Sequence, residues 1–391
     1  MKKLLYINLD FFKYQNKAKA QIKAFEKLKN KVEVATINNK EEDCYFEIYE
    51  YKNNEFNLKS KKKLTKSYKV EQGNNSFFSL WTRLRKTVKI NKLFKKEVIN
   101  YIENNQFDYC YIRRIGFFVI FLTSMFKRIS NSTKILYEIP TYPLDKYDSF
   151  LINFSQKIEM FYFNLFIKKY ITLIPVILQN DIKLDPKMIS ISNGIDYNKF
   201  QHTNDKKPVL DNTFHMLIVA HVLPWHGYDR LIKSIKEYQG KKKIVVDIYG
   251  DKNQEIKNLE ELTKQLNLTK QVYFKGEEKL ENILKGIDKY HIAIGSLGYH
   301  RRDGKYDTSI KNKEYCAMGL PFVTSSIDLS FPKDFKYLYK VESNDNAFEI
   351  EKIIDWYQSI SKENYKKEMK KYAKEHLEYE FIYKKVFDKL K

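Results

Sequence analysis

Apolar and polar positions follow one another at the start of the chain in the order that a strand, a helix and a second strand require. Leu4 to Leu9 form a short apolar run, which predicts a buried strand. Lys17 to Lys29 gathers its apolar side chains on one face of a helix, and Val32 to Ile37 is again strand-like. The chain therefore opens with a βαβ unit. It lacks a G-x-G-x-x-G turn, so a dinucleotide cofactor is not indicated.

The same alternation continues through the first half of the chain. We predict a helix over Phe77 to Ile99, strands over Asp108 to Arg113 and Lys134 to Tyr137, and an aromatic-rich helix over residues 149–170. Residues 45–70 mix strand-like pieces with lysines and are left unassigned. In open parallel sheets, ligands bind at the carboxyl ends of the strands. Residues that follow such ends are candidates for holding a substrate, namely Arg113, Arg114, Glu138 and Thr141.

A polar segment separates the two halves of the chain. Residues 201–212 contain one proline and no apolar periodicity, which predicts a linker. The strand and helix patterns then restart with Phe214 to Ala220, and from Ala347 the chain is helical to its end. We therefore expect an α/β fold of two domains, residues 1–200 and 213–365, that face a central cleft.

The charge balance predicts an anionic partner. Among 391 residues, 71 Lys+Arg against 49 Asp+Glu give a formal net charge of +22. Nucleic acid, an anionic membrane face and a phosphorylated substrate are the three classes that fit. Cys44, Cys110 and Cys316 are too few and too far apart for a disulfide framework or a zinc site, which favours a reducing cytoplasm. We expect neither a signal peptide nor a membrane-spanning helix.

A basic surface is predicted in the first half. Lysines cluster from Lys59 to Lys69, and basic residues lie off the apolar face of the helix over Phe77 to Ile99, whose apolar residues include Leu80, Trp81 and Leu84. Such a helix beside a lysine-rich loop is typical of proteins that bind anionic lipid. The alternative is the solvated face of an ordinary core helix.

Residues 299–325 hold the strongest pattern for binding a phosphorylated ligand. Thr308 and Ser309 open a helix, and the positive end of a helix suits a phosphate. One turn further, Lys311 and Glu314 share a face, so a cation could meet a phosphate while a carboxylate accepts hydrogen bonds from sugar hydroxyls. This predicts a nucleotide-sugar site. The alternative is an amphipathic helix with surface charges.

Five motifs stand in order in the second half of the chain. They are Asn193-Gly-Ile-Asp196, Trp225-His-Gly-Tyr-Asp-Arg-Leu-Ile232, Tyr249-Gly-Asp251, Val272-Tyr-Phe-Lys-Gly276 and Lys311-Asn-Lys-Glu-Tyr-Cys-Ala-Met-Gly-Leu-Pro321. With these motifs the chain resembles the retaining glycosyltransferases of the GT-B fold, in particular the large family four and its bacterial surface-polysaccharide branch. The similarity covers roughly residues 190–325 well and the first half more weakly, at Glu138 to Pro143. It implies two Rossmann-like domains with a C-terminal helix, residues 366–391, packing back on the first.

The resemblance assigns roles residue by residue. Glu314 matches the second glutamate of the family's Glu-x(7)-Glu pattern, which grips the ribose, and the first falls on Tyr306. The phosphate-neutralising Arg and Lys of the family fall near His221 and His226, so the fixed charge would come from Arg230 or Lys311. The remaining donor-site candidates are Gly250, Lys275, Gly276, His300, Arg301, Thr308, Ser309 and Ile310.

The implied chemistry is transfer of a hexosyl-type sugar from a nucleoside diphosphate to a polysaccharide or lipid-linked acceptor, with retention. No two aspartates lie two residues apart, so we expect no metal and no other cofactor. The catalytic candidates are His226, Arg230 and Lys311, which would stabilise the charge of the leaving diphosphate, and Glu138, which matches the strand end where relatives place a polar residue facing the sugar or acceptor. We expect a cytoplasmic protein on the inner membrane face, with a role in capsule or lipopolysaccharide synthesis. The alternatives are a non-catalytic GT-B partner subunit and a basic nucleic-acid-binding protein, for which no motif is present.

Overall fold

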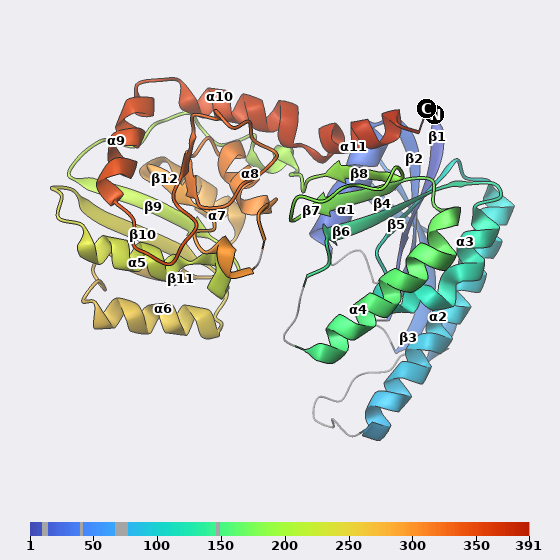
Figure 1. Ribbon diagram of the computed structural model, residues 1–391. Helices are drawn as coiled ribbons and strands as arrows, with labels where there is room; N and C mark the ends of the chain where they lie inside the picture. The colour runs from blue at the N-terminus through green and yellow to red at the C-terminus, as the bar shows by residue number, and fades with distance from the viewer. Residues whose placement is uncertain (10–14, 40–41, 67–76, 146–148, 303, 391) are drawn as a thin grey trace. The chain divides into compact units, whose positions relative to one another are not determined.

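A computed structural model describes residues 1–9, 15–39, 42–66, 77–145, 149–302 and 304–390, with the backbone alone for 77–84. Lys69 and the side chains of Leu80, Trp81 and Leu84 lie outside this description. The chain divides into two compact units (Figure 1). Unit 1 comprises Met1–Leu178, Ile182–Ile191 and Tyr383–Lys391, and unit 2 comprises Gln179–Asp181 and Ser192–Ile382.

Unit 1 is built on an eight-stranded sheet in the order β4-β3-β2-β1-β5-β6-β7-β8. The strands β2, β1, β5, β6, β7 and β8 pair in parallel with their neighbours in this order. At the β2 edge, β3 and β4 extend the sheet with antiparallel pairing. The bounds are β1 Lys2–Asn8, β2 Asn30–Asn38, β3 Asp43–Lys52, β4 Glu55–Lys66, β5 Tyr109–Arg113, β6 Lys134–Tyr142, β7 Ile174–Leu178 and β8 Met188–Ile191.

Alternation along the strands decides which helices cover each face of this sheet. Leu5 and Ile7 share one buried cluster with Phe94 of α2. Tyr6 points the other way, where its ring lies 6.2 Å from that of Phe25 in α1. The helices α2, α3 and α4 therefore lie on one face, and α1 lies on the other (Figure 1). The bounds are α1 Asn16–Lys27, α2 Phe77–Asn105, η2 Gly116–Leu122, α3 Thr123–Ile129, α4 Phe150–Tyr162 and η3 Phe163–Ile167.

The unassigned residues 45–70 contain the hairpin of β3 and β4. Asn53 and Asn54 have φ of 55° and 63°, which is the backbone that a tight two-residue hairpin turn requires. The lysines of β4 face carboxylates on neighbouring elements, so this part of the predicted basic surface is largely neutralised. The pairs are Lys59 with Glu33 at 2.9 Å, Lys61 with Glu47 at 3.6 Å, Lys62 with Glu97 at 2.8 Å and Lys63 with Asp43 at 2.6 Å.

Unit 2 holds a six-stranded parallel sheet in the order β11-β10-β9-β12-β13-β14. The strands β10 and β11 are added on one side of β9, and β12, β13 and β14 are added on its other side. The strand order therefore reverses between β9 and β12, where ligands of such sheets bind. The bounds are β9 Thr213–Val219, η6 Pro224–His226, α5 Tyr228–Glu237, β10 Lys243–Tyr249, α6 Gln254–Gln265, β11 Val272–Gly276, α7 Leu280–Lys285, β12 Ile292–Ile294, η8 Tyr299–Arg302, α8 Ile310–Ala317, β13 Phe322–Thr324, β14 Leu338–Lys340 and α9 Ile350–Ser361.

The C-terminal segment differs from the single helix expected over residues 366–391. It consists of α10 Tyr365–Tyr372, a π turn over Ala373–Leu377 and α11 Tyr379–Asp388. The first part stays with unit 2, where Lys370 Nζ donates to the carbonyl of Thr203 at 2.7 Å. Only the segment from Tyr383 joins unit 1, where Lys134 Nζ donates to the carbonyl of Leu390 at 2.7 Å.

Candidate functional site

The loops after β9 and β12 meet at the point where the strand order of unit 2 reverses. Leu297 N–H donates to the carbonyl of His226 at 2.8 Å, which joins the two loops. Gly227 has φ of 64°, and a Cβ at this position would lie 2.4 Å from the backbone nitrogen of Gly298. Only glycine allows this approach, so the Trp-His-Gly sequence has a structural reason for its third residue.

The helix α8 begins at this same end of the sheet. The N-cap residue of α8 is Ser309. Asn193 Nδ2 donates to the carbonyl of the preceding residue, Thr308, at 2.9 Å and so fixes the start of the helix. The hydroxyl of Ser309 and both polar atoms of the Asn312 side chain are buried and have no hydrogen-bond partner among the described residues. A Cβ at Gly295 would lie 2.5 Å from Asn312 Oδ1, so the fully buried amide sits directly against the end of β12. Buried polar groups without a partner are uncommon in folded proteins.

Two buried lysines of α8 have opposite environments. Lys313 Nζ lies 2.8 Å from the carboxylate of Asp328, and both side chains are fully buried. Lys311 is also buried, but the partner of its Nζ is the hydroxyl of Tyr228 at 3.3 Å, and no carboxylate lies within ion-pair distance in the described part of the chain. Burial lowers the pKa of Lys311 to about 8. A buried cation without a counter-ion is costly, and an anionic ligand would remove that cost.

His226 lies next to Lys311 and is neutral. Burial, followed by the positive charge of Lys311, lowers the pKa of His226 to about 2. Leu223 N–H donates to Nδ1 of His226 at 3.3 Å, so the ring hydrogen is on Nε2. His226 can therefore donate one hydrogen bond to an anion, but it adds no charge.

Glu314 is a partly exposed carboxylate one turn after Lys311. No hydrogen bond or ion pair joins its side chain to another side chain in the described ranges, and Lys199 acts on it only through its charge. Burial raises the pKa of Glu314 to about 7. A desolvated carboxylate without donors suits a ligand that carries hydroxyl groups.

Asp307 is a site residue that the sequence reasoning missed. Its side chain is buried and accepts hydrogen bonds from Ser296 at 3.0 Å and Ser326 at 3.4 Å. It also acts electrostatically on Lys311. Asp307 follows the position of the family's first glutamate by one residue, which was an available signal. Tyr306 itself points elsewhere, because its hydroxyl donates to the carboxylate of Asp181.

His300 and Arg301 are held by acidic side chains. Arg301 donates to Asp229 at 2.8 and 3.0 Å and to Asp345 at 2.7 Å, and His300 Nε2 lies 3.1 Å from Asp345. The carboxylate of Asp229 raises the pKa of Arg301 further. These contacts neutralise the pair, which differs from the predicted role at a donor phosphate.

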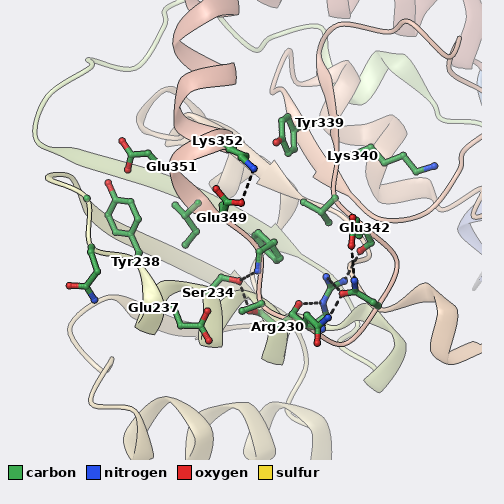
Figure 2. A pocket seen from close by; sticks show the side chains of 18 residues that line it. Arg230, Ser234, Glu237, Tyr238, Tyr339, Lys340, Glu342, Glu349, Glu351 and Lys352 are labelled. Atoms are coloured by element: carbon green, nitrogen blue, oxygen red, sulfur yellow. Dashed lines mark hydrogen bonds and ion pairs between the residues drawn. The ribbon is translucent and has the colours of Figure 1, made fainter.

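Arg230 has a structural environment rather than the predicted catalytic one. Only 1% of its surface is exposed, and its guanidinium donates to the carbonyls of Leu297, Glu342 and Asn346 and to the side chain of Asn344. Figure 2 shows it at one end of a groove of about 840 Å³ that runs between α5 and α9. None of Lys311, Glu314 and His226 lines this groove, so Arg230 fixes the loop after β14 instead of facing the site.

Gly250, Lys275 and Gly276 lie at the ends of β10 and β11. Gly250 lines a pocket of about 510 Å³ together with His221, Asp251, Glu277 and Glu278. Gly250 N–H donates to the carbonyl of Gly276 at 3.0 Å, which joins the two strand ends. Lys275 points to Asp247 at 3.6 Å. The glycines therefore border an open space, whereas the lysine is paired. Ile310, the first residue of α8, is exposed.

The acceptor-site candidates belong to unit 1. Glu138 is fully buried and accepts hydrogen bonds from Tyr111, Gln21 and Tyr383. Burial alone would raise its pKa, but the positive charges of Lys17 and Arg113 outweigh burial and lower the pKa to about 2. It therefore joins α1, β5 and α11 instead of facing a substrate.

The two predicted arginines of this unit differ in their surroundings. Arg114 forms a two-pronged ion pair with the buried carboxylate of Glu159 at 2.5 and 2.7 Å. Arg113 lies 3.6 Å from Glu138, and its buried Nε has no hydrogen-bond partner in the described ranges. Thr141 is partly exposed on β6. Arg113 and Thr141 therefore remain candidates for binding an acceptor.

Comparisons with solved structures agree with this architecture over the whole chain. A glycosyltransferase from Rickettsia africae matches with a TM-score of 0.65 and 12% identity, covering 99% of this chain and 97% of that chain. Sucrose-phosphate synthase from Thermosynechococcus elongatus gives 0.61 and 11%, covering 100% and 99%. HepE from Anabaena, solved with UDP, gives 0.55 and 10%, covering 100% and 99%. No curated protein sequence matches the chain.

The two units with their sheets therefore form the GT-B fold, which is the fold of these sugar-transferring enzymes. Residues 200–376 are similar to the model of the family described as Glycosyl transferases group 1, a match that spans less than half of the chain. The matched region contains β9 to β14 with Lys311 and Glu314, so the site described above lies within the region of similarity. No group of three or more His, Cys, Asp or Glu in the described ranges could hold a metal ion.

Proposed function

We propose that the protein is a retaining glycosyltransferase that moves a hexosyl-type sugar from a nucleoside diphosphate to a hydroxyl of a glycan or lipid-linked acceptor at an anionic membrane. The observation that carries this proposal is the contrast between the two buried lysines of α8. Lys313 has Asp328 as its counter-ion, whereas Lys311 has only the Tyr228 hydroxyl. An unpaired buried cation at the reversal point of the sheet is an environment that a diphosphate would complete.

The chemistry needs stabilisation of a leaving diphosphate, and the site offers three kinds of donor. Lys311 supplies the charge, His226 donates from Nε2, and the first turn of α8, whose N-cap side chain makes no capping hydrogen bond, offers backbone N–H groups. Glu314 would accept hydrogen bonds from the ribose. With these donors the reaction would proceed without a metal ion. HepE has been solved with UDP, and TarM with UDP and a glycosylated glycerol, which supports a nucleoside diphosphate as the product.

A panel of nucleoside diphosphate sugars tests the proposal by measuring nucleotide release with and without acceptor lipids. We expect release from one donor, at a rate that Lys311→Met lowers at least about tenfold. A chain that binds no nucleoside diphosphate and releases none would instead be a non-catalytic partner subunit. Binding to nucleic acid that is unaffected by nucleotides and declines steeply with salt would identify a nucleic-acid-binding protein.

A further inference from the structure

Helix α4 and the turn that follows it expose an apolar stripe in unit 1. The positions are three or four residues apart, which places them on one side of the helix. In a folded protein, large apolar side chains that gather on one surface mark an interaction site. The exposed fractions are 75% for Leu151, 52% for Phe154, 40% for Ile158, 68% for Phe161 and 54% for Leu165.

The opposite side of α4 is well packed, so the direction of the stripe is fixed. Glu159 is buried in its ion pair with Arg114, and Phe163 and Ile167 belong to the core of unit 1. The hydroxyl of Tyr162 lies 3.0 Å from that of Thr123 in α3. The stripe is therefore the outer side of a firmly anchored helix.

The charges beside the stripe are positive. Between residues 150 and 169 the acidic and basic residues are Lys157, Glu159, Lys168 and Lys169, and Glu159 is buried. Lys157 and Lys169 are exposed. The outer surface of α4 thus combines apolar side chains with cations and has no exposed carboxylate of its own.

A basic helix lies close to this surface. Both α2 and α4 pack against η2, and Lys95 Nζ of α2 donates to the carbonyl of Phe121 in η2 at 3.3 Å. The lysines of β4, by contrast, are paired with carboxylates. The exposed basic residues of α2 add to the positive charge of Lys157 and Lys169, and they include Lys89, Lys92 and Lys96.

We propose that the α4 stripe inserts into the interface of an anionic phospholipid membrane. A bilayer interface offers acyl chains for the apolar side chains and phosphates for the surrounding cations. A second copy of the chain would bring the same cations against each other, which disfavours a dimer through this surface. Within the described ranges no helix is long and apolar enough to cross a membrane, so α4 would lie along the surface. This inference stands independently of the proposed chemistry.

Vesicle cosedimentation of the full chain tests the proposal. We expect the wild type to bind vesicles that contain phosphatidylglycerol more tightly than vesicles of phosphatidylcholine alone. The variant Phe154→Ser/Phe161→Ser should lower the partition coefficient on both kinds at least about tenfold, because two aromatic rings are no longer transferred from water. The variant Lys157→Glu/Lys169→Glu should reduce the preference for the anionic lipid.

The matched control is Val209→Ser/Leu329→Ser, which removes apolar side chains of unit 2 that are 73% and 53% exposed. It should bind vesicles as the wild type does. All the replaced side chains are exposed, and circular dichroism verifies that each variant is folded. Wild-type vesicle binding by the phenylalanine variant would overturn the proposal. If that variant also changed the mass measured by light scattering from dimer to monomer, the stripe would be a contact between copies of the chain instead.

Discussion

Lys311→Met should make the protein more stable and less able to bind a nucleoside diphosphate. Methionine keeps most of the aliphatic stem of the lysine and removes the charge. Burial lowers the pKa of Lys311 from 10.5 to about 8. One unit of pKa corresponds to about 1.4 kcal/mol, so keeping the ammonium charged costs the folded protein about 3 kcal/mol.

The pH dependence of this gain follows from the direction of the change. The pKa of Lys311 is lower in the folded protein than in the unfolded chain, so the free-energy cost of its buried charge is fully present below pH 8. It disappears as the pH rises from about 8 to 10.5, because the folded protein then loses its proton first. We therefore expect Lys311→Met to raise the free energy of unfolding by about 2–3 kcal/mol near neutral pH, and the gain to vanish in strong alkali.

Urea unfolding at several pH values measures the stability, and calorimetry with UDP measures the affinity. We expect the affinity for UDP to fall by about 10- to 100-fold, because a charge-assisted hydrogen bond is lost. The control Lys352→Met removes a lysine on α9 whose side chain is 63% exposed, and it should change neither quantity appreciably. A Lys311→Met protein that is less stable than the wild type and binds UDP equally well would refute the reasoning.

Three further variants have contrasting expected outcomes. Lys313→Met leaves the buried carboxylate of Asp328 without its partner, so urea unfolding should show a loss of about 3–5 kcal/mol. Burial raises the pKa of Glu314 from 4.5 to about 7. Relative to the wild type, Glu314→Gln should therefore become more stable as the pH rises from 4.5 to 7, and the difference should stay constant above pH 7. We expect this difference to reach about 1–2 kcal/mol, since Glu314 is partly exposed, and calorimetry should show weaker binding of UDP. No gain at pH 8 relative to pH 4 would contradict the Glu314 assignment. Gly227→Ala forces a Cβ to within 2.4 Å of the Gly298 nitrogen at a positive φ, and thermal unfolding should show a loss of more than about 1 kcal/mol.

Local pattern was sufficient to predict much of the framework. The strands β1, β9 and β10 and the helices α1, α5 and α6 each carry an apolar periodicity that is written within the segment itself. The hairpin of β3 and β4 was left unassigned, although its Asn53-Asn54 turn was a usable signal. The strand β14 was not predicted, because three residues are too few to show a period.

The environment of the charged residues depended on partners far away in the chain. In the sequence, Arg230 has no evident partner. In the fold, its guanidinium donates to the carbonyls of Leu297, Glu342 and Asn346. Arg114 similarly meets Glu159 only because α4 packs beside the end of β5. The sequence contains the charges, but it does not show which of them the fold neutralises.

The sequence by itself determined the order of strands and helices, the family motifs and the position of Lys311 and Glu314 at the start of a helix. Only the tertiary structure distinguished Lys311 from Lys313, since both are lysines of one short helix and the difference is the distant Asp328. It also showed that Phe154 and Phe161 of α4 face outward, which periodicity cannot reveal because an apolar stripe looks the same whether it is covered or exposed. Periodicity is a local property, whereas burial and pairing depend on which segments the fold brings together.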